Sequence, residues 1–80
     1  MAVGTIRYWA GARAAAGTSE EAYDGATLAE VLAAARDRRD AEFARVVSSC
    51  SFLVQGTRAD PDKALADGDV IEVLPPFAGG

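Results

Sequence analysis

The sequence contains no histidine and a single cysteine, Cys50. Without histidine, the chain has neither the usual acid–base catalyst at neutral pH nor an imidazole ligand for a metal. One cysteine excludes an internal disulfide and a zinc site built from cysteines, and a lone cysteine is usually a small apolar packing residue. We therefore expect no metal site and little catalysis by the chain alone. We interpret Cys50 as a packing residue rather than a sulfur-relay residue.

Long apolar runs and an excess of basic residues are also missing. No run reaches the length that crosses a bilayer, and the N-terminus lacks the basic-then-apolar layout of a signal peptide. The formal net charge of −4 argues against binding to a phosphate backbone. We expect a cytoplasmic protein with no nucleic-acid or membrane partner, folded as one domain, because 80 residues can bury only one modest core.

Strand patterns are present in four places. β-Branched and aromatic residues with a two-residue alternation predict strands over residues 3–10, 50–55 and 70–74, and a less regular pattern predicts one over 19–24, paired with the first as a hairpin. Between the two strands of the hairpin, residues 12–17 are expected to form an alanine-rich loop. Gly56-Thr57 and the Asp67-Gly68-Asp69 segment are expected to form turns.

A helix is predicted from residue 28 to about residue 39. Thr27 and Glu30 have the spacing of a capping box, in which the hydroxyl of Thr27 accepts from the amide of Glu30 and the carboxylate of Glu30 accepts from the amide of Thr27. Leu28, Val31, Leu32 and Ala35 then recur as an amphipathic stripe. Its charged end, residues 36–40, is expected to face solvent, and residues 41–47 to add one or two helical turns.

These elements predict an α+β domain with one sheet, a helix on one face and a right-handed crossover. The predicted core is Ile6, Tyr8, Leu28, Val31, Leu32, Phe52, Val54, Leu65, Ile71 and Val73. Phe43 and one of Val46 and Val47 are expected to be buried by the second helical segment.

The end of the chain carries the most specific signal. The segment Asp67-Gly68-Asp69-Val70-Ile71, the ending Leu74-Pro75-Pro76-Phe77-Ala78-Gly79-Gly80, and the opening Ile6-Arg7-Tyr8-Trp9-Ala10 with Arg13 resemble the MoaD/ThiS family of ubiquitin-like sulfur carriers. The double proline is most similar to MoaD, the small subunit of molybdopterin synthase. The resemblance implies a β-grasp fold, with a mixed sheet of four to five strands and one main helix over residues 1–74, and a flexible Gly-Gly tail over residues 75–80.

The resemblance also implies where chemistry happens. The carboxylate of Gly80 would be adenylated and then thiocarboxylated, with ATP and magnesium bound by a MoeB/ThiF-type adenylyltransferase and none by this chain. A sulfurtransferase or desulfurase would supply sulfur, and a MoaE-like large subunit would use it. The residues agree with nucleotide binding by the partner rather than by this chain, because the sequence has no phosphate-binding loop motif.

The tail residues suit entry into a partner's active site. Gly79 and Gly80 present no side chain that would block a narrow channel. Pro75 and Pro76 favour an extended path, and six extended residues reach roughly 20 Å. The tail therefore comprises Pro75, Pro76, Phe77, Ala78 and Gly79 leading to the reactive Gly80.

The alternation of the strands also predicts a docking patch on the open sheet face. If the apolar partners face the helix, then Arg7, Trp9, Leu53, Val70 and Leu74 face away from it, together with Glu72, and exposed apolar residues at a tail's root favour a partner site. Other functions remain open from the sequence: a sulfur carrier for thiazole, cysteine or another metabolite, a ubiquitin-like protein modifier, or a plain interaction module.

Overall fold

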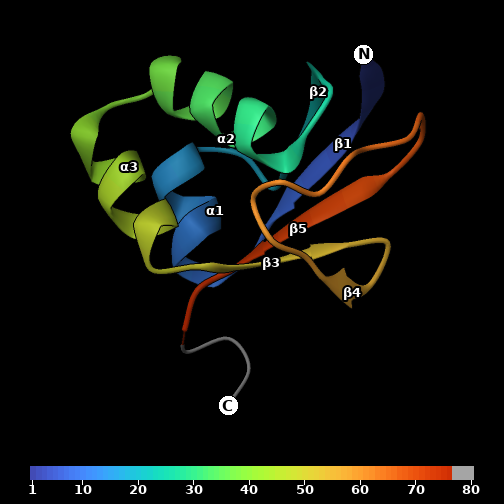
Figure 1. The fold of residues 1–80 in the computed structure, drawn as a ribbon. Helices are drawn as coiled ribbons and strands as arrows, with labels where there is room; N and C mark the ends of the chain where they lie inside the picture. Colours follow the sequence, from blue (N-terminus) through green and yellow to red (C-terminus); the bar gives the residue numbers. More distant parts are fainter. Residues whose placement is uncertain (77–80) are drawn as a thin grey trace.

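The structure, a computed structural model of the chain, describes residues 1–76. Three helices gather on one side of a sheet (Figure 1). The elements in chain order are β1 (Ala2–Tyr8), α1 (Ala10–Ala16), β2 (Glu20–Gly25), α2 (Leu28–Asp37), α3 (Ala41–Ser48), β3 (Ser51–Val54), β4 (Thr57–Arg58) and β5 (Val70–Leu74). The α+β class predicted from the sequence is confirmed, and β5 has the predicted bounds.

The sheet is mixed and has the strand order β2-β1-β5-β3-β4. β1 pairs antiparallel with β2, as the predicted hairpin requires, and parallel with β5. β3 pairs antiparallel with β5 and with β4. The last strand of the chain therefore lies in the middle of the sheet beside the first, and the C-terminal end of β5 is supported on both sides.

The β3–β4 hairpin turns through two residues with positive φ, Gln55 at 52° and Gly56 at 79°. Two such residues between paired Val54 and Thr57 match the tight hairpin turn whose twist fits that of the strands. The turn thus lies one residue earlier than predicted, and Thr57 begins a short edge strand.

The segment predicted as a loop over residues 12–17 is instead mostly helical. α1 begins at Ala10, two residues after β1 ends, so the first strand is shorter than predicted. Its residues are rich in alanine, the best helix former, and it ends at Gly17, whose φ of 78° allows its N–H to donate to the carbonyl of Arg13 at 3.0 Å. The helix forms in place of the predicted loop because alanine favours helix and Gly17 can end the helix in the left-handed conformation.

The N-terminus of α2 has the predicted cap with one change. The amide of Glu30 donates to Oγ1 of Thr27 at 3.3 Å, as predicted, but the carboxylate of Glu30 accepts from the amide of Ala26 at 3.4 Å rather than from Thr27. The predicted stripe of Leu28, Val31, Leu32 and Ala35 is buried. The helix ends at Asp37, two residues before the predicted end.

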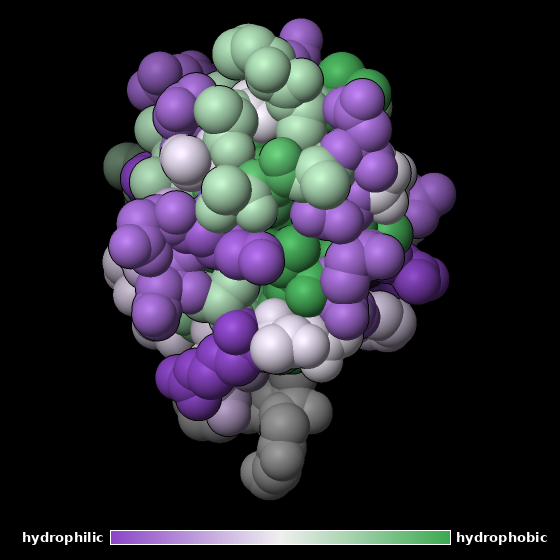
Figure 2. Space-filling model, turned by 45° about the vertical axis from the view of Figure 1, so that its right-hand side comes forward, coloured by the Kyte–Doolittle hydropathy of each residue, from purple (hydrophilic) through white to green (hydrophobic). Residues whose placement is uncertain are grey.

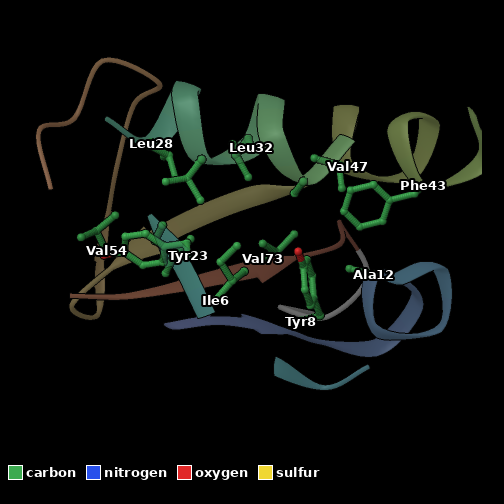
Figure 3. Packing of buried hydrophobic residues seen from close by; sticks show 13 residues of the cluster. Ile6, Tyr8, Ala12, Tyr23, Leu28, Leu32, Phe43, Val47, Val54 and Val73 are labelled. Carbon is green, nitrogen blue, oxygen red and sulfur yellow. The ribbon is translucent and has the colours of Figure 1, made fainter. Parts of the chain in front are cut away.

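The core lies between the helices and the sheet, and Figure 3 shows Leu28, Leu32, Phe43 and Val47 pointing toward residues of the sheet. Eight of the ten predicted core residues are buried, whereas Phe52 and Leu65 are partly buried against the cluster. The further members of the cluster are Ala12, Tyr23, Ala35, Phe43 and Val47. Phe43 contacts the edge of the Tyr8 ring, with ring centroids 5.8 Å apart.

Arg39 does not face solvent as predicted, because its side chain is only 15% exposed. Its guanidinium pairs with the carboxylate of Glu21 at 2.8 Å, donates from Nε to the carbonyl of Ala16 at 3.1 Å, and lies over the rings of Tyr8 and Phe43. This arginine joins the α2–α3 connection to the end of α1 and to β2. Among residues 1–76, only its Nη1 is a buried side-chain polar atom without a partner.

The hydroxyl of Tyr8 completes this network by donating to Glu21 at 2.5 Å. Burial raises the pKa of Tyr8, and the hydrogen bond to Glu21 and its charge raise it further. Burial alone would raise the pKa of Glu21, but the hydrogen bond from Tyr8 and the charges of Arg39 and Arg38 outweigh it, so the pKa of Glu21 is lowered. Glu21 is therefore held ionised and Tyr8 neutral.

Within residues 1–76, no helix combines the length and apolarity required for a membrane span. The same residues contain no group of three or more histidine, cysteine, aspartate or glutamate side chains arranged to hold a metal ion. Figure 2 shows a strip of hydrophobic residues flanked by hydrophilic ones on the face that it presents.

Candidate functional site

The described chain ends at the root of the predicted tail. β5 runs to Leu74, and Pro75, which was assigned to the tail, is buried, whereas Pro76 is exposed. The N–H of Trp9 donates to the carbonyl of Val73 at 3.2 Å and so fixes the start of α1 beside this root. The predicted site residues Phe77, Ala78, Gly79 and Gly80 lie outside the described residues.

Strand register brings three open-face residues into one row beside the root. Arg7 of β1 is the pairing partner of Glu72 of β5, and Glu72 is in turn the partner of Leu53 of β3. Partners in neighbouring strands point to the same face. Because Ile71 and Val73 are buried under the helices, these three side chains lie on the face away from them.

Trp9 is an exposed aromatic residue on this face, with 40% of its surface accessible. Its indole Nε1 donates to the carboxylate of Glu72 at 3.1 Å, and the guanidinium of Arg7 lies 5.4 Å from the centre of its ring. A hydrogen bond and a cation–π contact therefore hold the ring in place before any partner arrives. Glu72, whose carboxylate accepts that hydrogen bond, is a site residue that the strand alternation placed on this face without assigning it a role.

The other predicted patch residues are less accessible than expected. Leu53, Val70 and Leu74 are on the predicted face, but each is only partly exposed. Arg7 is exposed and lies 3.9 Å from the carboxylate of Glu20. The patch is thus a mixed surface in which one tryptophan is flanked by charged residues and by the edges of three aliphatic side chains.

Sequence reasoning missed a hollow next to this patch. It has a volume of about 170 Å³ and is lined by Arg7, Tyr8, Trp9, Arg13, Ser19 and Glu20. The hollow exists because α1 folds Arg13 back beside the end of β1, and the amide of Tyr8 donates to the carbonyl of Ser19 at 2.8 Å. The alanine-rich run before Gly17 was the available signal for this helix.

Cys50 packs against the core and is partly buried. Its thiol donates to the carbonyl of Val46 at 3.3 Å, and burial raises its pKa. A raised pKa reduces the thiolate fraction at neutral pH, and the thiolate is the nucleophile. The geometry of Cys50 agrees with a packing residue, and the described part of the site offers a docking surface.

Comparison with known proteins connects this geometry to a family. The model of the ThiS family matches residues 6–80 of the chain. No protein of curated function matches the sequence.

Solved structures match over nearly the whole chain. A protein described as molybdopterin converting factor, subunit 1, from Pyrococcus furiosus is 26% identical with a TM-score of 0.84, covering 96% of this chain and 100% of its own. Small archaeal modifier protein 1 from Methanosarcina acetivorans is 27% identical with a TM-score of 0.85, covering 100% of this chain and 98% of its own. These similarities confirm the β-grasp, ubiquitin-like fold.

A third match concerns a complex. The structure of subunits 1 and 2 of the molybdopterin-converting factor from Helicobacter pylori contains a chain 22% identical to this one, with a TM-score of 0.73, 98% of this chain covered and 99% of that chain. At this identity the match shows the shared fold.

Proposed function

Because the chain belongs to the ThiS family, we propose that it is a sulfur carrier whose C-terminal carboxylate, on Gly80, is converted to a thiocarboxylate. The observation that carries the proposal is that the family match continues through residue 80 and so includes the terminal Gly-Gly. The chain supplies the carboxylate and a rigid domain that presents it, and partner enzymes supply the catalysis.

The reaction needs two displacements. An oxygen of the Gly80 carboxylate attacks the α-phosphorus of ATP and pyrophosphate leaves, which makes the carboxyl carbon an acyl adenylate. The sulfur of a sulfide equivalent then attacks that carbon, and AMP leaves with the bonding electron pair. A carboxylate is otherwise a poor electrophile, so the adenylation step belongs to a MoeB/ThiF-type adenylyltransferase that binds ATP and magnesium.

Within the family, we assign the chain to molybdopterin synthesis as the small subunit of the synthase. The similarity to the Pyrococcus furiosus subunit 1 and the Pro75-Pro76 pair before the terminal glycines support this assignment. The Helicobacter pylori complex has subunit 2 as the partner of a chain with the same fold, which supports a MoaE-like large subunit as partner here.

A second candidate is a ubiquitin-like modifier joined through Gly80 to lysine side chains of other proteins. The similarity to small archaeal modifier protein 1 favours it about as strongly as the other matches favour the synthase. Both functions require an activated Gly80 carboxylate and differ in the nucleophile, which is sulfide for the carrier and an amine for the modifier.

Intact mass separates these functions. We expect a gain of about 16 Da, one oxygen replaced by sulfur, after incubation with the adenylyltransferase, ATP and sulfide. A variant with one residue added after Gly80 should fold normally and gain nothing. In extracts, ladders of lysine conjugates containing this chain would favour the modifier over the carrier, and full sulfur loading of the extended variant would refute the carboxylate mechanism.

The open-face patch is proposed to dock both the adenylyltransferase and the large subunit. Trp9 is its anchor, because exposed, pre-positioned aromatic residues contribute most to such interfaces. Trp9→Ala should weaken binding to each partner about tenfold, by roughly 1.4 kcal/mol. Val3→Ala, an exposed apolar control at the far end of β1, should leave both affinities unchanged. Normal binding of Trp9→Ala to both partners would contradict the patch.

A further inference from the structure

The outer edge of β2 is a free border of the sheet. β2 stands at one end of the strand order and pairs on one side only, with β1 (Figure 1). It is six residues long, whereas β4 at the opposite border has two. The unpaired N–H and C=O groups of a long edge strand can pair with another chain. β2 is therefore the border at which a further strand has room to pair.

The register shows which backbone groups of β2 point outward. The amide of Tyr8 donates to the carbonyl of Ser19 at 2.8 Å, so these two residues form a hydrogen-bonded pair across the two strands. In an antiparallel pair, such positions recur at every second residue. Every second residue of β2 from Glu21 onward therefore bonds to β1. The backbone groups of the alternate residues point away from β1, and these residues are Glu20, Ala22 and Asp24.

The outward groups of Ala22 and Asp24 are open to a partner. Both residues are exposed, and their outward N–H and C=O groups form no hydrogen bond with any other part of residues 1–76. At Glu20 the carbonyl already accepts from the hydroxyl of Thr18 at 3.0 Å. An extended segment laid antiparallel along β2 would satisfy both outward groups of Ala22 and of Asp24.

Charge differs between the two ends of this edge. At its start, Glu20 faces Arg7 at 3.9 Å. Glu21 pairs there with Arg38 at 3.0 Å and with Arg39 at 2.8 Å. The acidic charges at the start of β2 are thus balanced by arginines of the same chain.

Asp24, near the other end, has no such balance. Among residues 1–76 it makes no salt bridge, and its pairing neighbour on β1 is the uncharged Val3. Glu30 adds a second exposed carboxylate nearby, because its Oε1 accepts from the amide of Ala26, two residues after Asp24. Opposite charges that face each other across a strand pair stabilise it. A strand added at this edge is therefore favoured when it places a basic side chain opposite Asp24.

A second copy of the chain is a poorer occupant. Two β2 strands related by a two-fold axis run antiparallel, and the register centred on Ala22 pairs the whole strand. That register sets Glu20 of each copy opposite Asp24 of the other. Like charges directly opposite each other are destabilising, and charged side chains on an edge strand oppose pairing between copies.

From these observations we infer that the outer edge of β2 binds an extended segment of a partner protein as an antiparallel strand, with a lysine or arginine of that segment opposite Asp24. Main-chain pairing supplies the affinity. The basic residue fixes the register, because a shift by one residue turns it to the other face of the sheet. The edge lies on a different strand from the residues of the open-face patch, and its binding does not depend on chemistry at Gly80.

The test uses a synthetic peptide with capped ends and the sequence Thr-Lys-Thr-Val-Thr-Thr-Thr. Its valine lies opposite Ala22 when its lysine lies opposite Asp24. Binding to the isotopically labelled full chain is followed by the shifts of the backbone amide resonances. The amides of Ala22 and Asp24 should shift most, because they donate to the added strand. A peptide with glutamate in place of the lysine should bind about fivefold more weakly.

Two blocked forms test whether the main chain carries the binding. N-methylation of the valine removes the N–H of the peptide that donates to the carbonyl of Ala22. Ala22→Pro removes the outward N–H of the protein, and proline is compatible with an edge strand at a position whose N–H faces solvent. Either change should abolish the amide shifts at the same peptide concentration. The N-methylated peptide requires no change in the protein, so it decides the question even if Ala22→Pro fails to fold.

A charge reversal tests the register. Asp24→Lys should reverse the preference, so that the glutamate peptide binds about fivefold more tightly than the lysine peptide. Glu42→Lys makes the same charge change at an exposed residue of α3 and should keep the preference of the wild type.

Each contrary result overturns a stated part of the inference. Undiminished binding of the N-methylated peptide, or shifts centred on another surface, would overturn strand addition. An unchanged preference in Asp24→Lys would overturn the register, and no binding of the lysine peptide would overturn the inference as a whole. Dimerisation of the wild type that Ala22→Pro abolishes would assign the edge to a second copy instead. None of these results bears on the proposed function.

Discussion

Arg39 provides the sharpest test of how the domain is held together, because its role was invisible in the sequence pattern. Replacing it with methionine keeps an apolar stem of similar length over Phe43 and removes the charge. The variant loses the 2.8 Å pair with Glu21 and the 3.1 Å hydrogen bond to the carbonyl of Ala16. The connection between α2 and α3 then loses two polar contacts, one with α1 and one with β2.

The expected cost follows from these contacts. Removing one member of a fully buried ion pair costs about 3 to 5 kcal/mol, but Glu21 keeps the hydroxyl of Tyr8 and the guanidinium of Arg38 as partners. The lost hydrogen bond adds about 1 kcal/mol. We expect Arg39→Met to lower the free energy of unfolding by about 2 to 3 kcal/mol, and the melting temperature by about 10 to 20 °C for a domain of this size.

Arg38 is the matched control, because it also binds Glu21, at 3.0 Å, but its side chain is 49% exposed. Arg38→Met should cost about 0.5 kcal/mol, as exposed ion pairs do. Urea denaturation followed by fluorescence of Trp9 measures both variants. If Arg39→Met is as stable as Arg38→Met, the buried network does not stabilise the fold and the reasoning fails.

Two further predictions concern the fold. The pKa of Glu21 is lowered in the folded state, so its contribution to stability is complete above its ordinary pKa of 4.5 and is lost as pH falls through the folded pKa. In an acid titration, the Glu21→Gln variant should therefore lose less stability below pH 4.5 than the wild type does. Parallel curves of stability against pH for the two proteins would contradict this. At Gly4 an added Cβ would lie 2.3 Å from the carbonyl oxygen of Asp69 and 2.6 Å from the hydroxyl of Tyr23, so Gly4→Ala should destabilise by about 2 to 4 kcal/mol. Gly11→Ala, in open space within α1, should be neutral or stabilising by up to about 1 kcal/mol, and equal thermal stability of the two variants would refute the steric argument.

The sheet could be predicted from the sequence because its strands alternate strongly. In β5, the alternation of apolar Ile71 and Val73 with charged Glu72 predicted which side chains face the helices. The same alternation in β1 predicted that Arg7 lies on the face away from the helices. The amphipathic stripe beginning at Leu28 fixed α2 in the same way. In each case a local pattern and tertiary burial agree.

The remaining features depend on contacts that local patterns do not contain. Arg39 lies in a run of charged residues, and only the folding of α1 and β2 against it makes it a buried partner of Glu21. The hollow likewise requires Arg13 of α1 to meet Arg7 at the end of β1. The open-face patch was predicted by residue, but the bond between Trp9 and Glu72 joins positions 63 residues apart and follows from strand pairing alone.

The most direct test of the account is the mass of the C-terminal peptide after sulfur loading. The chain contains one lysine, Lys63, so cleavage after lysine releases residues 64–80 as a single peptide. After incubation with the adenylyltransferase, ATP and sulfide, this peptide should gain about 16 Da, localised to Gly80 by fragmentation. A peptide of unchanged mass, or a gain localised to Cys50 in the other fragment, would contradict the claim that Gly80 carries the sulfur.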